Sequence, residues 1–193
     1  MKSEELRVGV AHTRNYSLNR IMTLESSRKK LIFRRICLAL ILLLISVLQN
    51  TDGFFPQFFG VRALLLIPAV VCIAMFERDI FGMVFGIFAG ALWDITASGA
   101  SFNALFLMTV GFLCGTLINT IMRNNVVTAF ILSSVAAVIY NIGYWLFHYV
   151  FGGLDKAAFM LLRYYLPSVA YTVVLVPLVF IIIRSVEKKF VEE

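Results

Sequence analysis

A series of long apolar runs, separated by short polar segments, constrains this chain more than any other feature. Of its 193 residues, 61% are hydrophobic and only 15% are charged, and the mean hydropathy is +0.90. So few charged residues cannot cover the surface of a water-soluble domain of this length. Lipid is therefore the expected solvent for most of the chain, and the runs predict membrane-spanning helices.

Six runs are expected to cross the membrane, which predicts an all-α integral membrane protein with a six-helix polytopic bundle. The expected spans are residues 36–49, 61–76, 81–94, 102–122, 126–151 and 165–183. An interfacial helix is expected at "AAFMLLRYYLP", and the first two spans are short enough that five spans remain an alternative. The predicted domains are a basic N-terminal tail (1–30), a six-span transmembrane domain (31–185) and a C-terminal tail (186–193).

The distribution of charge predicts the orientation of the spans. The net charge is +6, and nine of the 17 basic residues, but only three of the 11 acidic ones, lie before residue 36. Basic residues gather in cytoplasmic segments of membrane proteins, so both termini are expected in the cytoplasm. The excess charge belongs to one tail, not to a folded basic domain, which argues against nucleic-acid binding. Anionic lipid is the expected partner of the tail, and a cytoplasmic filament is the alternative.

The residues that most enzymes and metal sites need do not occur in this sequence in the required patterns. The cysteines Cys37, Cys72 and Cys114 lie in separate apolar runs without the CxxC spacing of a metal site. The sequence contains no HExxH, GxSxG or P-loop motif. We therefore expect a protein without catalytic activity, metal or cofactor.

The stretch "FGMVFGIFAGALWD" places Gly82, Gly86, Gly90 and Asp94 at intervals of four residues, and hence on one helix face. Gly111 and Gly115 repeat the spacing in the next span. Glycine at this spacing lets another helix backbone approach closely. Two interpretations follow: the face packs two helices of this chain together, or it docks a helix of another protein.

Asp94 is expected near the outer, C-terminal end of its helix, where the helix dipole disfavours an anion. The carboxylate is therefore expected to be solvated, to bond the backbone of the "TASGAS" turn, or to contact a partner chain. A role in proton relay ranks lower, since a relay usually needs several acids and the predicted spans offer no second one.

The segment "YNIGYWLFHY" in the fifth predicted span contains Asn141, Tyr144 and His148 at intervals of three and four residues, so these side chains share a face. This face is a possible small-molecule pocket. The alternative is that it bonds across helices and contributes to an interfacial aromatic belt.

The stretch "GMVFGIFAGALWDITASGASFNALFLMTVGFLCGTLIN" resembles the MreD family of bacterial rod shape-determining proteins. In that family a glycine-spaced helix ends on an Asp and is followed by a small-residue turn with Gly, positions taken here by Gly86, Gly90, Asp94 and Gly99. The resemblance implies a non-enzymatic component of the cell-elongation machinery in the plasma (inner) membrane. It also implies association with MreC, and through it with MreB filaments and wall synthases.

Under this resemblance, the partner-binding residues would be those of the striped helix and the following turn. They are Gly82, Gly86, Gly90, Asp94 and Gly99.

A second class, the substrate-binding membrane subunit of an energy-coupling-factor vitamin transporter, also has six spans and a similar length, and the two classes could share a helical architecture. Members usually carry an AxxxA-like face on the first helix, whereas the first span here, "ICLALILLLISVLQN", has only Ala39, with Leu43 four residues later. This difference favours the shape-determining class.

Overall fold

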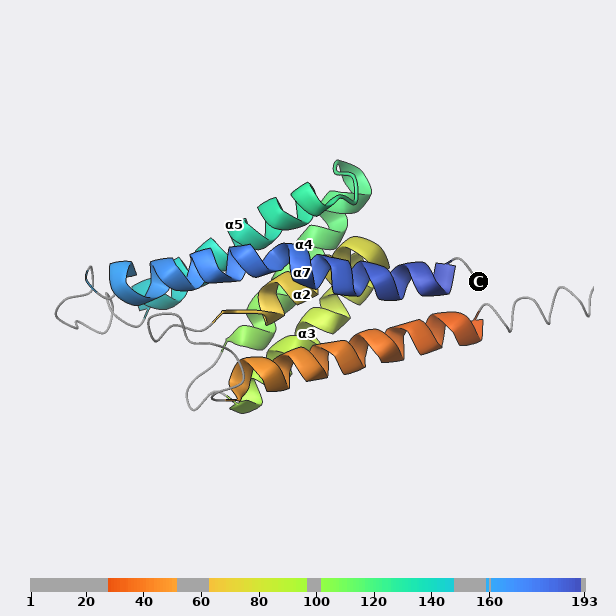
Figure 1. The fold of residues 1–193 in the computed structure, drawn as a ribbon, viewed down its shortest axis with the longest axis horizontal. Helices are drawn as coiled ribbons and strands as arrows, with labels where there is room; N and C mark the ends of the chain where they lie inside the picture. The colour runs from red at the N-terminus through yellow and green to blue at the C-terminus, as the bar shows by residue number, and fades with distance from the viewer. Residues whose placement is uncertain (1–27, 52–62, 97–101, 148–158, 160, 192–193) are drawn as a thin grey trace, which may run out of the picture.

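The structure is a computed structural model of the whole chain, and it describes residues 28–51, 63–96, 102–147, 159 and 161–191. All regular elements in these ranges are helical, as the sequence predicts (Figure 1). The first helix covers Arg28–Asn50. The others are α2 (Leu66–Glu77), α3 (Asp79–Thr96), α4 (Asn103–Thr120), α5 (Val126–Trp145), the π-helical turn η2 (Leu161–Tyr165) and α7 (Leu166–Val191).

Five of the described helices are long and apolar enough to cross a membrane: the first helix, α3, α4, α5 and the continuous segment Leu161–Lys189 formed by η2 and α7. This agrees with a multi-pass membrane protein. In contrast, α2 has 12 residues. Its length is about 18 Å, which is less than the roughly 30 Å of a bilayer's hydrocarbon core.

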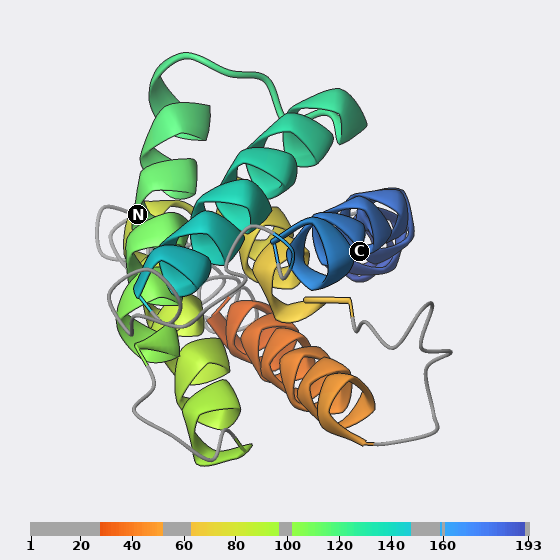
Figure 2. The same cartoon turned by 90° about the vertical axis from the view of Figure 1, so that its left-hand side faces the viewer.

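The short helix α2 is the centre of the bundle. Figure 2 shows it surrounded by the longer helices, and it contacts α3, α4, α5 and α7. Ten consecutive residues, Leu66 to Met75, are buried. Hydropathy alone predicts an ordinary span here, since an apolar residue covered by protein has the same sequence signal as one covered by lipid.

Side chains of two other helices satisfy the backbone at the start of α2. The Leu66 N–H donates to Gln49 Oε1 of the first helix at 3.0 Å, and the Leu64 N–H donates to Thr172 Oγ1 of α7 at 2.9 Å. Water cannot accept these hydrogen bonds when the start of a helix is buried in lipid or protein. Gln49 and Thr172 therefore allow α2 to begin inside the bundle.

The longest helices extend beyond the expected spans. The first helix already includes Arg28, within the segment predicted as a tail, and α7 continues to Val191, well into the predicted C-terminal tail. Pro177 lies inside α7 without ending it. The ends of these helices nearest the two chain termini lie at the same end of the bundle (Figure 1).

Candidate functional site

The glycine stripe of α3 lies against α4. A methyl group on Gly86 would collide with the backbone of Leu107, and one on Gly90 would collide with the backbone of Ala104. A Cβ on Gly82 would lie 2.7 Å from the carbonyl oxygen of Gly111. Because side chains at these positions would push the two backbones apart, the glycines let α3 and α4 pack in direct contact.

The two glycines of α4 complete this contact. A Cβ on Gly111 would collide with the Gly82 backbone, and one on Gly115 would lie 2.7 Å from the Cα of Asp79. The face for which the sequence left two interpretations open is therefore filled by α4. In this structure it packs two helices of the chain together, and a partner could reach Gly82, Gly86 or Gly90 only by displacing α4.

Asp94 joins the end of α3 to the start of α4. Its Oδ1 accepts the backbone N–H of Asn103 at 3.2 Å, and its Oδ2 accepts that of Ala104 at 3.0 Å. Phe102, at the N-cap position of α4, makes no side-chain capping bond, so Asp94 supplies the cap from the neighbouring helix. The carboxylate thus sits at the positive end of the α4 dipole, which offsets its unfavourable place on α3. Gly99 lies outside the described residues.

An aromatic group ties this hairpin to α5. The Tyr140 hydroxyl donates to Asn103 Oδ1 at 2.7 Å. The Tyr140 ring lies 5.1 Å from that of Trp93 and 5.2 Å from that of Phe106, measured between ring centroids. These spacings are typical of favourable aromatic pairs. Asn103 therefore belongs to both the Asp94 cap and the contact with α5.

The predicted pocket residues have different surroundings in the structure. Asn141 is buried, and its amide donates to the Ala137 carbonyl of its own helix at 2.8 Å. Tyr144 is 46% exposed and stacks on Tyr140, with ring centroids 6.2 Å apart. His148 lies outside the described residues. The described bond of Asn141 thus lies within α5 and not across helices, as the alternative had expected, while Tyr144 belongs to a row of aromatic rings.

The helix face that includes Asn141 carries a second row of small residues. Ala129, Ser133 and Ala137 recur every four residues along α5 and are buried, and α5 contacts α2 and α7. This row was not predicted from the sequence, because the prediction of close packing rested on glycine alone. The spacing of Ala and Ser at four residues was the available signal.

A buried ion-pair cluster joins three helices at the other end of the bundle. Arg34 Nη2 of the first helix lies 2.5 Å from Glu77 Oε1 of α2, and Arg34 Nη1 lies 3.1 Å from Glu187 Oε2 of α7. Arg35 Nε bonds the other Glu77 oxygen at 3.1 Å, and its guanidinium carbon lies 3.4 Å from the Phe81 ring centroid. The Glu77 side chain is only 1% exposed.

This cluster was not predicted from the sequence, and Glu187 lies in the segment expected to form the C-terminal tail (186–193). Glu77 directly follows an apolar run and lies on the same predicted side of the membrane as the basic pair, and this was the available signal. Charges taken out of water need such partners, because an unpaired buried charge is strongly unfavourable.

Neighbouring polar contacts hold the same end together. Asn119 of α4 donates to Asp79 Oδ1 at the start of α3, and Asn124 donates to the Met75 carbonyl of α2 at 3.2 Å. Arg78 joins α2 to α3 with a φ of 73°, a conformation that favours glycine.

Within the described ranges, no group of three or more His, Cys, Asp or Glu side chains is placed to hold a metal ion. The polar side chains described above instead link helices to one another. Comparison with protein-family models, with curated proteins and with solved structures found no match.

Proposed function

We propose that this chain is a non-enzymatic, six-span scaffold of the bacterial plasma membrane that works in the cell-elongation machinery, as MreD proteins do. Both termini face the cytoplasm in this proposal. The six spans would be the first helix, α2, α3, α4, α5 and α7, with α2 as a short span covered by the others.

The observation that carries the proposal is the use of Gly86, Gly90 and Asp94 in one structural unit. These are three of the four residues that carry the resemblance to the MreD family, and in this fold all three join α3 to α4. A short motif that repeats at four-residue intervals and ends on an acid thus specifies a tightly packed hairpin. A family that depends on this hairpin would retain these residues for architecture, and its partner would bind elsewhere.

The surroundings of the buried polar groups also support a scaffold. Asp94 caps α4, Glu77 and Glu187 pair with arginines, and the Asn103 side chain accepts the Tyr140 hydroxyl. Each of these groups fixes one helix relative to another. Such contacts supply a rigid membrane surface for a partner, which is the property that a scaffold needs.

The test is purification of the tagged protein from its native membranes in a mild detergent, with mass spectrometry of the proteins that accompany it. Recovery of a bitopic MreC protein and wall synthases is expected. Recovery of an ATPase pair with its coupling subunit would instead indicate vitamin uptake. Recovery of neither group, from a sample in which the tagged protein is intact, would contradict the scaffold.

A matched pair of variants makes this test specific. Gly86→Leu places a side chain against the α4 backbone, whereas Gly143→Leu adds one at a position where no other described segment lies within 4 Å of the added Cβ. The scaffold proposal expects the first variant to lose its partners and the second to keep them. Equal recovery with both variants would mean that the partner does not need the α3–α4 hairpin.

A further inference from the structure

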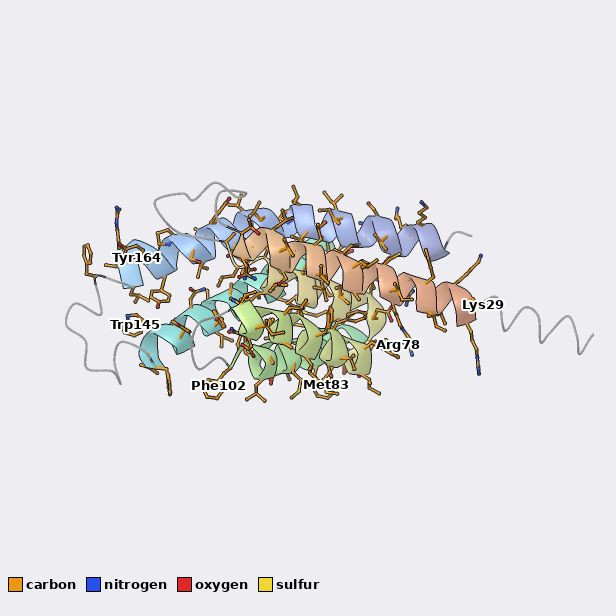
Figure 3. All side chains as sticks on the ribbon, turned by 90° about the horizontal axis from the view of Figure 1, so that it is seen from below. Lys29, Arg78, Met83, Phe102, Trp145 and Tyr164 are labelled. Atoms are coloured by element: carbon orange, nitrogen blue, oxygen red, sulfur yellow. The ribbon has the colours of Figure 1, made fainter. Side chains whose placement is uncertain are left out.

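Two neighbouring helix ends present exposed basic side chains at one end of the bundle. Figure 3 shows the first helix and α7 side by side, with the labelled Lys29 near the tip of the first helix. The exposed basic residues are Arg28 and Lys29 on the first helix and Arg184, Lys188 and Lys189 on α7, and Lys30 is half-buried. Together these six residues are called the basic patch.

The Arg34–Glu187 ion pair sets the geometry of the basic patch. It connects the two helices at 3.1 Å, with both side chains largely buried. Lys30 precedes Arg34 by about one helical turn, and Lys188 directly follows Glu187. A buried contact therefore holds basic side chains from two separate parts of the sequence close to each other.

The described acids of this region do not neutralise the basic patch. Glu77 and Glu187 are buried and pair with Arg34 and Arg35, and Asp79 accepts a hydrogen bond from Asn119. In the described part of the chain, the remaining acid, Asp94, lies in the last turns of α3, away from the basic patch. Among the described residues, the exposed positive charges are thus available to an anionic ligand.

Exposed apolar side chains begin within about two turns of the basic patch on both helices. They are Leu31, Ile32 and Phe33 on the first helix and Leu178, Ile181 and Ile182 on α7. Ile182 and Lys188 are separated by about 9 Å along a helix, and the polar headgroup layer of a bilayer is roughly 5–7 Å deep on each side. The spacing between the apolar and the basic side chains along each helix therefore matches the distance between the acyl chains and the phosphate of a lipid.

We propose that the basic patch binds the headgroup of an anionic phospholipid whose acyl chains lie along the exposed apolar faces of the first helix and α7. The adjoining apolar surface favours a lipid over an acidic protein, since a water-soluble partner would not contact side chains that lie at the depth of the acyl chains. The proposal rests on the positive charge of the basic patch and on the Arg34–Glu187 ion pair, which holds the two helix ends together. It does not depend on the scaffold function.

The test uses the full-length protein reconstituted in phosphatidylcholine bilayers that contain a trace of spin-labelled phosphatidylglycerol or spin-labelled phosphatidylcholine. The motionally restricted fraction of each label gives its relative affinity for the protein. The wild type is expected to prefer phosphatidylglycerol, and the double variant Arg184→Gln/Lys188→Gln is expected to lose about fivefold or more of that preference. High salt is expected to weaken the preference as well, since exposed charges are screened.

The control removes two exposed arginines elsewhere at the same end, Arg78→Gln/Arg123→Gln, and is expected to keep the preference. A wild type that restricts both labels equally would overturn the proposal. Equal losses in the two double variants would also overturn it, because net charge alone would then explain the preference. If Arg184→Gln/Lys188→Gln fails to fold, Lys29→Gln/Lys189→Gln removes two other patch charges, and an unchanged preference in that folded variant would overturn the proposal.

Discussion

The Asp94 carboxylate of α3 accepts the backbone N–H of Ala104, in the first turn of α4, at 3.0 Å. An acid at the end of one helix thus caps the start of the next. The unfavourable interaction of Asp94 with its own helix end is replaced by a favourable one with the α4 dipole. The bond also lies beside Gly90, whose missing side chain lets the Ala104 backbone approach.

Removing this cap should weaken the hairpin. We expect Asp94→Ala to lower the free energy of unfolding by about 1–2 kcal/mol, because two N–H groups of α4 lose their acceptor. The change is measured by unfolding the protein in detergent micelles with increasing dodecyl sulfate and monitoring the loss of helicity by circular dichroism. Thr96→Ala is the control, since the Thr96 hydroxyl bonds only carbonyls of its own helix among the bonds described. If the cap does not contribute to stability, the two variants will have equal free energies of unfolding.

Much of the fold around this hairpin follows from local sequence signals. Hydropathy predicts apolar helices. The four-residue spacing of glycine predicts close helix packing, whether the second helix belongs to this chain or to another protein. The identity of that second helix does not follow, because spacing says nothing about the partner. For the same reason, the sequence left open whether water, the following turn or a partner chain would bind Asp94, and it did not locate the N–H groups of Asn103 and Ala104 that do so.

The central position of α2 and the ion-pair cluster were beyond sequence reasoning for a different reason. Residues 66–75 are apolar whether lipid or protein covers them, so hydropathy cannot distinguish a peripheral helix from a central one. Arg35 and Glu77 are 42 positions apart. Their contact depends on how the whole bundle folds, so no local sequence pattern predicts it.

Two glycines test how far close packing determines stability. Gly86→Ala places a methyl group against the Leu107 backbone, so we expect a loss of at least about 2 kcal/mol of unfolding free energy as α3 and α4 separate. At Gly143, no other described segment lies within 4 Å of an added Cβ. Gly143→Ala should therefore raise stability by about 0.5–1 kcal/mol through higher helix propensity. Thermal unfolding of both variants in one detergent gives the comparison, and a shift of the same sign in both would contradict this packing.

The ion-pair cluster predicts an order among its members. Glu77 binds both Arg34 and Arg35, whereas Glu187 pairs with Arg34. Glu77→Gln should cost about 3–5 kcal/mol, because it leaves buried positive charge without its main partner, and Glu187→Gln should cost less. The double variant Arg34→Met/Glu77→Met should cost at least as much as Glu77→Gln, because it leaves Glu187 as well as Arg35 without its described partner. Unfolding titrations of the three variants check the order, and a Glu187→Gln variant as unstable as Glu77→Gln would contradict it.

Arg78 connects α2 to α3 in a single residue, with φ 73° and ψ 175°. A side chain in this region of backbone space costs of the order of 1–3 kcal/mol, and glycine avoids most of that cost. Arg78 is exposed, so little packing is lost when its side chain is removed. Arg78→Gly should therefore stabilise the protein by about 1 kcal/mol, while Arg78→Ala, which retains a Cβ, should leave stability nearly unchanged. Thermal unfolding of the two variants separates the backbone from the charge: equal gains would assign the effect to removal of the guanidinium, and a loss in Arg78→Gly alone would mean that the connection is unstrained.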